Sequence, residues 1–170
     1  MKNILIVGAG GQIGSELVPA LRKIYGQNNV VATDINSNVN PVLLEGPFEV
    51  LDALDAKKMA ELVKKYKIDT IFNMVALLSA VGEKDPTLAW KINMGCLFNC
   101  LETAREFNCA VTTPSSIGAF GPSTPHDNTP QDTIMRPTTI YGVIKVSAEL
   151  LSDYYYHRFG VDTRGVRFPG

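Results

Sequence analysis

The chain alternates between strand-like apolar runs and helical apolar periodicity along its whole length. This alternation is typical of βαβ units, in which parallel strands form a sheet and the connecting helices cover its faces. We therefore predict an α/β fold of the doubly wound Rossmann type, with a parallel sheet of about six strands and helices on both faces. The predicted strands span 3–7, 29–33, 48–51, 69–75, 109–114 and 162–167, the predicted helices span 12–25, 56–66, 85–107 and 138–159, and loops are predicted at 36–47 and 117–136.

The composition supports one globular domain. The 170 residues include 45% hydrophobic and 19% charged residues, which is the balance of a chain that can bury a core. The formal net charge is −1, so the chain lacks the basic surface that would bind a nucleic acid or an anionic membrane. The N-terminal apolar run is too short for a signal peptide, and no other run approaches membrane length. We predict a cytoplasmic protein without a nucleic-acid or membrane partner.

The cysteines and histidines show no spacing that would bind a metal. Cys96 and Cys100 lie one helical turn apart on a helix face that the periodicity predicts to be buried, and Cys109 follows in an apolar run. We therefore predict reduced core cysteines and no metal site. His126 and His157 have no partner at a useful spacing and are predicted to lie at the surface.

A glycine-rich segment follows the first predicted strand and opens the first predicted helix. It reads GAGGQIG over residues 8–14. Gly8 permits a tight turn, Gly11 lets backbone N–H groups approach a pyrophosphate, and Gly14 lets helix and strand pack closely. The helix N-terminus then faces the anion. The spacing is G-x-x-G-x-x-G rather than G-x-G-x-x-G, and a glycine-rich turn can also be purely structural, so this segment alone is weak evidence for a dinucleotide site.

Asp34 follows the second predicted strand, 20 residues after Gly14. A carboxylate there would accept hydrogen bonds from the adenosine ribose hydroxyls of a dinucleotide and would repel a 2′-phosphate. The next residues, Ile35 and Asn36, provide no cation, so the sequence favours NAD over NADP. The alternative is that Asp34 only forms a turn or a cap. Asp52 is similarly open, because it would either border the adenine pocket or cap the following helix.

Tyr141 and Lys145 are four residues apart on the last predicted helix and therefore project from one face. A lysine ammonium near a phenol favours the phenolate and lowers its pKa from about 10 towards the working range, which makes Tyr141 a candidate general base. Ser115 and Ser116 follow the fifth predicted strand, and a hydroxyl there would hold the substrate oxygen that Tyr141 deprotonates. Seen alone, a Y-x-x-x-K pair is more often an exposed surface pair.

Together these motifs resemble those of the extended short-chain dehydrogenase/reductases, the NAD-dependent epimerase/dehydratase family, which includes nucleotide-sugar epimerases and dehydratases. The resemblance covers all 170 residues in the same order. It rests on Gly8, Gly11, Gly14, Asp34, Asp52, residues 73–76, Asn93, residues 115–121, Tyr141 and Lys145.

Within this family the chain is most similar to the L-threonine 3-dehydrogenases of the short-chain type, notably over residues 11–17, 76–83, 114–122 and 136–145. Sugar epimerases of the family tend to have an aromatic residue at position 12 and tyrosine at position 120, where this chain has Gln12 and Phe120. The resemblance implies that L-threonine is oxidised at its 3-hydroxyl to 2-amino-3-ketobutyrate, with NAD as the cofactor.

The resemblance also assigns roles to particular residues. Tyr141 would take the proton of the hydroxyl, and Lys145 would hold the nicotinamide ribose. Ser116 would bind the reacting oxygen, and Asn93 would support a proton relay unless its amide only bonds within its own helix. The predicted substrate contacts are Ser79, Ser115, Ser116 and Tyr141, of which the loop serines could equally form turns. The predicted cofactor contacts are Gly8, Gly11, Gln12, Ile13, Gly14, Asp34, Ile35, Asn36, Asp52, Ala53, Met74, Ala76, Tyr141 and Lys145.

Two other functions remain open. One is that of a nucleotide-sugar epimerase or dehydratase of the same family. An assay would distinguish it from a threonine dehydrogenase by whether a nucleotide sugar or threonine supports the NAD chemistry. The other is that of a non-catalytic dinucleotide-sensing module, which would have no reason to keep the tyrosine, lysine and serine set.

The helices predicted at 85–107 and 138–159 carry apolar faces that are broader than a sheet needs for its cover. In the resembling family this helix pair forms the four-helix bundle of a dimer, so we predict a homodimer. The alternative is that these faces only pack on the sheet.

The sequence stops directly after the last predicted strand, at Gly170. We expect residues 1–170 to form the NAD-binding domain with the catalytic residues, and a C-terminal substrate-binding portion to be absent. A reacting end that is open to water loses much of its rate, so we expect this chain alone to bind NAD weakly and to turn over little threonine.

Overall fold

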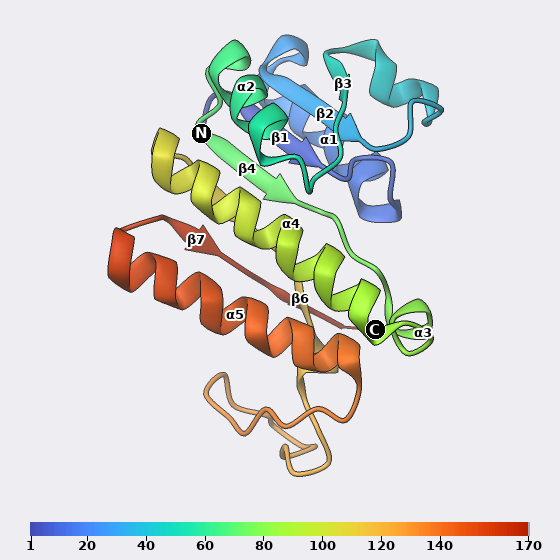
Figure 1. The fold of residues 1–170 in the computed structure, drawn as a ribbon, viewed down its shortest axis with the longest axis vertical. Helices are drawn as coiled ribbons and strands as arrows, with labels where there is room; N and C mark the ends of the chain where they lie inside the picture. Colours follow the sequence, from blue (N-terminus) through green and yellow to red (C-terminus); the bar gives the residue numbers. More distant parts are fainter. Residues whose placement is uncertain (170) are drawn as a thin grey trace.

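A six-stranded parallel sheet forms the centre of the computed structural model, which describes residues 1–169 (Figure 1). The strands are β1 (Ile4–Val7), β2 (Val30–Asp34), β3 (Phe48–Val50), β4 (Thr70–Asn73), β5 (Ala110–Thr112) and β7 (Thr163–Arg164). Their order, β3-β2-β1-β4-β5-β7, confirms the predicted doubly wound sheet. Val7 at the end of β1 pairs with Thr33 of β2 and with Asn73 of β4, so the carboxyl ends of these strands meet at one edge. Gly170, the last residue of the predicted domain, lies outside the described residues.

Helices cover both faces of the sheet, as predicted. They are α1 (Gln12–Tyr25), α2 (Ala56–Tyr66), the short α3 (Ser79–Gly82), α4 (Pro86–Phe107) and α5 (Ile140–Phe159). Side chains alternate along β1, so that Ile4 and Ile6 share one core cluster with α1 while Leu5 and Val7 share the other with α2, α4 and α5. Helices α4 and α5 lie side by side (Figure 1). None of the helices within residues 1–169 is long and apolar enough to cross a membrane.

The helix ends follow from local sequence. Asp55, Asp85 and Thr139 each accept a hydrogen bond from a backbone N–H in the first turn of the helix that follows, and so cap α2, α4 and α5. The last helix, α5, ends at Gly160, whose φ of +71° is a conformation that favours glycine. In contrast, α1 begins after Gly11 without any side-chain cap, which leaves its first N–H groups to a ligand.

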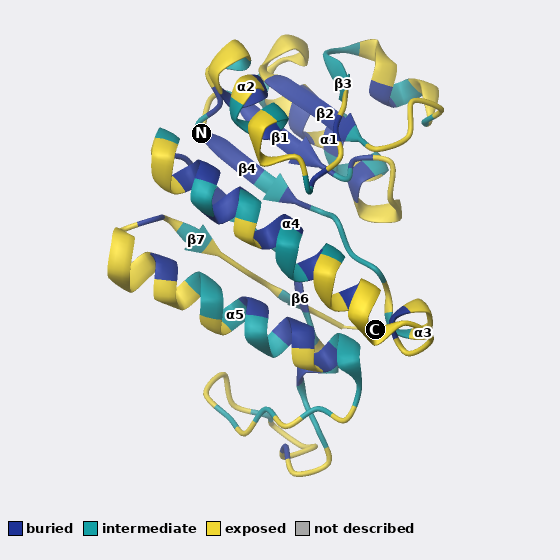
Figure 2. Ribbon diagram, in the orientation of Figure 1, coloured by how far each residue is buried: buried dark blue, intermediate teal, exposed yellow. Residues whose placement is uncertain are grey.

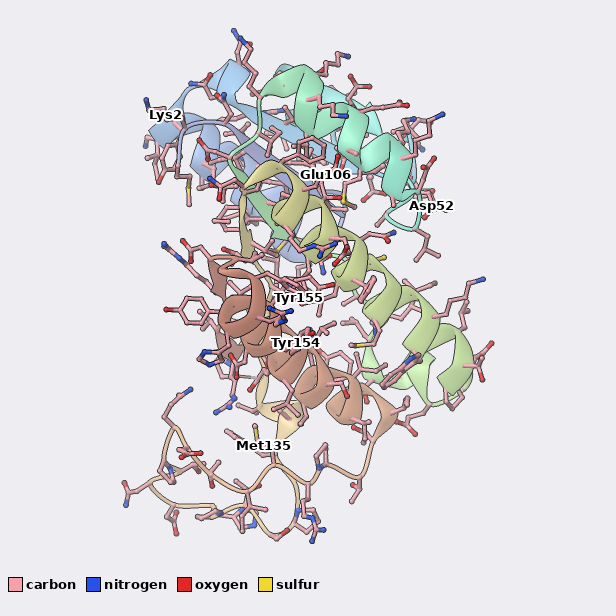
Figure 3. All side chains as sticks on the ribbon, turned by 60° about the vertical axis from the view of Figure 1, so that its left-hand side comes forward. Lys2, Asp52, Glu106, Met135, Tyr154 and Tyr155 are labelled. Atoms are coloured by element: carbon pink, nitrogen blue, oxygen red, sulfur yellow. The ribbon has the colours of Figure 1, made fainter. Side chains whose placement is uncertain are left out.

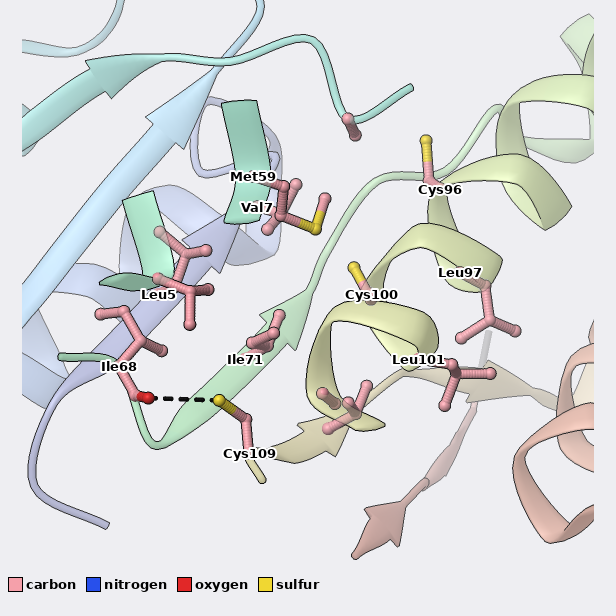
Figure 4. Packing of buried hydrophobic residues seen from close by; sticks show 14 of the residues in the cluster. Leu5, Val7, Met59, Ile68, Ile71, Cys96, Leu97, Cys100, Leu101 and Cys109 are labelled. Atoms are coloured by element: carbon pink, nitrogen blue, oxygen red, sulfur yellow. Dashed lines mark hydrogen bonds between the residues drawn. The ribbon is translucent and has the colours of Figure 1, made fainter. Parts of the chain in front are cut away.

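The core surrounds β1, β2 and β4, which are buried except at Asp34 and Phe72 (Figure 2). All three cysteines lie in this core as free thiols, which confirms the prediction, and the thiol of Cys109 donates a hydrogen bond to the carbonyl oxygen of Ile68 at 3.1 Å (Figure 4). Burial raises the pKa of Cys96 to about 12 and that of Cys109 to about 11, and it raises the pKa of Cys100 as well. Both histidines are exposed, as predicted.

The strands predicted at 109–114 and 162–167 are each divided in two, so this part of the prediction is wrong. Beyond β5 and β7 the same two segments pair again as β6 (Ser115–Ser116) and β8 (Arg167–Phe168), in a separate two-stranded sheet. The offset between the two segments is unchanged, and the N–H groups of Thr113 and Ser115 still bond to the carbonyls of Arg164 and Val166. Pro114, which has no N–H group, lies at the interruption.

The loop predicted at 36–47 contains a short 3-10 helix, η2 (Pro41–Glu45), which the sequence analysis missed. The guanidinium group of Arg22 in α1 holds it by donating hydrogen bonds to the carbonyl oxygens of Val42, Leu43 and Pro47. Arg22 is buried, and burial lowers the pKa of its guanidinium. These contacts fasten the segment that follows Asp34 to the body of the domain.

The loop predicted at 117–136 begins with another 3-10 helix, η3 (Ile117–Ala119), and then extends away from the sheet below α5 (Figure 1). Thr124 draws this excursion together, because its hydroxyl accepts a hydrogen bond from the N–H of Gly121 and donates one to the carbonyl of Ile134. The excursion therefore has internal structure of its own.

Candidate active site

The glycine-rich segment leads from β1 into α1 as predicted, and close contacts require glycine at positions 8 and 14. Gly8 has a φ of +82°, and a Cβ added to it would lie 2.8 Å from the side chain of Val75. A Cβ at Gly14 would lie 2.6 Å from the carbonyl oxygen of Ala9. A Cβ at Gly11 would meet only the Gly8 oxygen, at 3.6 Å, so the space above Gly11 is open. An open loop beside an uncapped helix N-terminus suits a pyrophosphate.

Asp34 lies at the carboxyl end of β2 and faces the same loop. One of its carboxylate oxygens accepts a hydrogen bond from the N–H of Gly10 at 2.9 Å, and the other accepts one from the N–H of Asn36 at 3.0 Å. The residues that follow, Ile35 and Asn36, are exposed. The carboxylate is therefore held beside the glycine loop, where ribose hydroxyls of a dinucleotide would lie.

Asp52 does not cap α2, so that alternative is wrong. Its carboxylate accepts a hydrogen bond from the N–H of Leu54 and thereby forms a turn, while Asp55 provides the cap. The neighbouring Ala53 is buried, and its carbonyl accepts a hydrogen bond from the side chain of Asn99 at 2.9 Å. Asp52 is exposed, and Figure 3 shows it at the turn that leads into α2. It can thus face the adenine end of a cofactor.

The segment after β4 passes directly beside the glycine loop. The N–H of Met74 bonds to the carbonyl of Val7, and Val75 packs on Gly8. Met74 and Ala76 are half-buried in this segment. The structure therefore brings the predicted contacts of strand four next to those of strand one.

Asn93 makes a contact that the sequence did not suggest. Its side-chain oxygen accepts a hydrogen bond from the N–H of Leu77 at 2.7 Å, and its side-chain nitrogen donates one to the carbonyl of Leu77 at 3.1 Å. The amide is buried and both of its polar atoms are engaged. Asn93 neither bonds within its own helix nor points freely at a reacting group, and it anchors the segment that leads to Ser79.

Tyr141 and Lys145 lie in the first turns of α5. The Lys145 ammonium lies 5.4 Å from the centre of the Tyr141 ring and donates a hydrogen bond to the carbonyl oxygen of Pro114 at 2.7 Å. Burial lowers the pKa of Lys145, and the charge of Glu149 partly offsets this effect. The predicted pair is therefore assembled, with the lysine against both the phenol and the serine-bearing segment.

Two glycines let the segment that follows Ser116 pack closely against the start of α5. Gly142 packs against the carbonyl of Gly118, because a Cβ at Gly142 would lie 2.2 Å from that oxygen. A Cβ at Gly118 would in turn lie 3.3 Å from the Tyr141 ring and 3.4 Å from the hydroxyl oxygen of Ser116. Gly118 therefore lies between the serine hydroxyl and the tyrosine ring.

The two neighbouring serines face different surroundings. The hydroxyl of Ser115 donates to Glu149, and the residue is 6% exposed, so Ser115 is already committed within the protein. The hydroxyl of Ser116 is half-buried and accepts a hydrogen bond from the N–H of Gly118 at 3.1 Å. Of the pair, Ser116 is the one available to a substrate.

Ser79 begins the short helix α3 and is half-buried. Glu83, just after α3, accepts a hydrogen bond from the N–H of Ile140 at 2.7 Å and so ties this segment to the start of α5. Ser79 thus belongs to a segment that is fastened at both ends, to α4 through Asn93 and to α5 through Glu83.

Four side chains that shape this edge were missed from the sequence: Glu83, Asn99, Glu149 and Arg167. Only Glu149 had a usable signal, since it continues the four-residue spacing of Tyr141 and Lys145 along one helix face. The others act on partners that are distant in the sequence, and no local pattern reveals such pairs.

A family model described as the NAD dependent epimerase/dehydratase family matches residues 4–169. This chain belongs to that family. An uncharacterised epimerase/dehydratase of Staphylococcus saprophyticus is 59% identical over 171 residues, an alignment that covers 100% of this chain and 53% of the relative.

Members of the family with solved structures are similar as well. The L-threonine dehydrogenase of Clostridium difficile is 56% identical with a TM-score of 0.97, and the match covers 100% of this chain and 54% of that one. The L-threonine dehydrogenase of Phytophthora infestans is 48% identical with a TM-score of 0.93, and the match covers 99% of this chain and 54% of that one. The chain thus spans about half the length of these relatives.

Membership of this family confirms the resemblance found in the motifs, the fold and NAD as the cofactor. The geometry fits such a cofactor, because the open glycine loop, the uncapped start of α1 and the Asp34 carboxylate lie together at one edge of the sheet.

Proposed function

We propose that the whole protein oxidises the 3-hydroxyl of L-threonine with NAD, producing 2-amino-3-ketobutyrate and NADH. The observation that carries this proposal is the convergence of Ser116, Tyr141 and Lys145 at the cofactor edge of a chain that is 56% identical to an L-threonine dehydrogenase. Gln12 and Phe120 further favour threonine over a nucleotide sugar, because sugar epimerases of the family tend to have aromatic residues at both positions, with tyrosine at the second.

The cofactor would be held by residues from three strand ends. The glycine loop and the N-terminus of α1 would bind the pyrophosphate, Asp34 would bind the adenosine ribose, and Lys145 would bind the nicotinamide ribose. Met74 and Ala76 would lie beside the cofactor where they follow β4. The bound nicotinamide supplies the site that accepts a hydride.

The protein's own residues would handle the proton. Tyr141 removes the proton of the 3-hydroxyl while the C3–H bond breaks as hydride, so that a C=O bond forms and the substrate loses two electrons and two hydrogens. Because the Ser116 oxygen accepts a hydrogen bond from Gly118, its own proton remains to be donated to the reacting oxygen. The Lys145 ammonium, 5.4 Å from the centre of the Tyr141 ring, would supply positive charge beside the reacting groups.

Asn93 was predicted to support a proton relay. Both polar atoms of its amide are bound to Leu77, and this contact favours a role in holding the segment around Ser79 in place. An amide whose oxygen and nitrogen are both bound to the backbone is held in a fixed orientation, which suits a structural role.

A substrate panel tests the proposal. The protein is incubated with NAD and either L-threonine, a UDP-sugar or a dTDP-sugar, and NADH formation and sugar products are followed. We expect NADH formation with L-threonine at a turnover of about 1 s⁻¹ or more in the whole protein, and none with the sugars. Conversion of a nucleotide sugar alone would assign the epimerase or dehydratase function, and NAD binding without either reaction would assign a sensing role.

A further inference from the structure

Glu149 lies one turn after Lys145 on α5 and joins separate segments of the chain. Its carboxylate accepts two hydrogen bonds from Arg167, from Nε at 2.9 Å and from Nη2 at 2.7 Å, and a third from the hydroxyl of Ser115. Burial disfavours the charged form of Glu149, but the bonds from Arg167 and Ser115 outweigh this effect and hold its pKa below the usual range. Glu149 is therefore a charged acceptor at neutral pH.

Together, Lys145 and Glu149 hold two successive residues of one segment. Lys145 binds the carbonyl of Pro114, and Glu149 binds the hydroxyl of Ser115. The main chain is thus fixed to α5 at two points immediately before Ser116. A displacement of this segment relative to α5 must break at least one of these bonds.

Arg167 extends the same network to the excursion below α5. Its Nη1 donates to the carbonyl of Gln131 at 3.1 Å, its Nη2 lies 3.2 Å from the sulfur of Met135, and its guanidinium lies 5.4 Å from the centre of the Phe120 ring. Met135 lies just beneath α5 in Figure 3. One ion pair therefore fixes α5, β6, β8 and the excursion to one another.

A cavity of about 450 Å³ borders this ion pair and is lined by Glu149, Arg167, Ser152 and Asp153, among others. Packing on this side leaves space into which the Glu149 side chain could turn. Its hydrogen bonds, rather than close packing, therefore keep it pointed at Ser115.

We propose that Glu149 is a positioning residue: through Ser115 and Arg167 it sets the place of the Ser116 hydroxyl relative to Tyr141. The kinetic consequence rests on the proposed function, whereas the link between Glu149 and the serine segment does not. Since a displacement of about 1 Å in a reacting group can reduce the rate about 10²-fold, loss of this link should lower kcat. Ser115, predicted to touch the substrate, would then act through Glu149.

Three variants of the whole protein test this inference: Glu149→Gln, Ser115→Ala and the double variant. Glu149→Gln weakens the ion pair, whereas Ser115→Ala removes only the hydroxyl bond and leaves the ion pair with Arg167. The matched control is Asp162→Asn, because Asp162 forms an equally bidentate pair with Arg164 at the start of β7, outside the network of Glu149 and Ser115. Steady-state kinetics gives kcat and the KM values for NAD and threonine. Hydrogen exchange gives the mobility of residues 116–120 without any substrate.

We expect both single variants to lower kcat by roughly 10- to 100-fold with the KM for NAD unchanged, and the double variant to be little worse than the poorer single one. Exchange over residues 116–120 should rise in Glu149→Gln and Ser115→Ala and stay constant in Asp162→Asn. Unchanged exchange in both single variants would overturn the inference even if the protein has no threonine activity. The inference would also be overturned if Ser115→Ala changed only the KM for threonine and its effect were additive with that of Glu149→Gln. Ser115 would then be a substrate contact.

Discussion

Two effects shift the pKa of Lys145 in opposite directions. Burial lowers the pKa of the ammonium, and the Glu149 carboxylate one turn away raises it. The charge that Lys145 offers to Tyr141 therefore depends on a residue that touches neither the phenol nor the expected cofactor position. The same Glu149 carboxylate binds Ser115, so one residue influences both the charge of Lys145 and the position of the serine segment.

Tyr141→Phe removes the group that would take the hydroxyl proton and keeps the ring. We expect turnover with threonine to fall by about 10² to 10⁴, the usual contribution of general-base catalysis, with little change in NAD affinity. Steady-state kinetics measures the turnover, and calorimetry measures the affinity for NAD. Near-normal turnover in this variant would remove Tyr141 from the role of base.

Asp34 should determine the choice of cofactor. Its carboxylate would bind ribose hydroxyls and repel a 2′-phosphate, so we expect tighter binding of NAD than of NADP and a smaller difference in Asp34→Ala. Asp34→Asn removes the negative charge but keeps the support of the glycine loop, because an amide oxygen can still accept the hydrogen bond from the N–H of Gly10. Calorimetry with both cofactors provides the measurement, with Glu61→Gln, which removes an exposed carboxylate on α2, as the control. Equal affinities in the parent protein would contradict this prediction.

Helices α4 and α5 each have one buried side and one exposed side. Their inner sides bury residues such as Leu97 and Ile144, while apolar side chains remain exposed on their outer sides (Figure 2). On α5, Leu150 is 60% and Tyr154 is 52% exposed. Exposed apolar side chains of this kind typify a surface that another chain covers.

We propose that these faces of α4 and α5 form a homodimer interface. Leu150→Glu should shift the protein towards the monomer, because a carboxylate would have to be desolvated in the interface. Sedimentation velocity measures the shift. Leu44→Glu, which changes an exposed leucine on η2 in the same way, is the control and should leave the association state unchanged. A monomeric parent protein would contradict the proposal.

The elements with regular patterns could be predicted from the sequence. Both ends of α1 and α2, and the C-terminal ends of α4 and α5, agree with the prediction to the residue, because apolar periodicity marks these helices clearly. The missed elements η2 and α3 are too short for any periodicity, and η2 depends on Arg22 reaching across from α1. The interruption after β5 had a signal in Pro114, which the prediction did not use.

For the whole molecule, the buried thiols should make the fold sensitive to alkaline pH. An unfolded cysteine ionises near its ordinary pKa of 9.0, whereas Cys109 and Cys96 hold their protons in the fold to about pH 11 and 12. Above pH 9 the unfolded chain therefore binds fewer protons than the native one, and the free energy of unfolding falls by up to about 1.4 kcal/mol per pH unit for each thiol. Lys145 has the opposite effect on the pH dependence of the free energy of unfolding, because its pKa is lowered in the fold, and this effect involves one proton.

Urea unfolding under reducing conditions between pH 7 and pH 10 tests this prediction. The free energy of unfolding should decline above pH 9, and the decline should be smaller in Cys100→Ala, which removes the most deeply buried thiol. The slope with pH is the relevant quantity, since the substitution also changes packing. A slope that is zero in the parent protein, or identical in the variant, would contradict the assignment.

The site was predictable to the extent that its parts lie at strand ends. Residues 8–14, Asp34, Tyr141 and Lys145 follow from the rule that ligands bind at the carboxyl edge of such a sheet. What could not be predicted was which side chains were already engaged. Ser115 is held by Glu149, 34 residues later in the chain, and a pairing over that distance leaves no local pattern.

The unbroken register between the segment that ends in β6 and the segment that ends in β8 has a consequence for changes in chain length. Deletion of one residue between Ala110 and Pro114 would move each later residue back by one place, so Ser116 would face Glu149 and Ile117 would take the place of Ser116. The site would lose its hydroxyl although both serines remained in the sequence. The register of this segment, and not merely the presence of a serine, thus decides which side chain can act on a substrate.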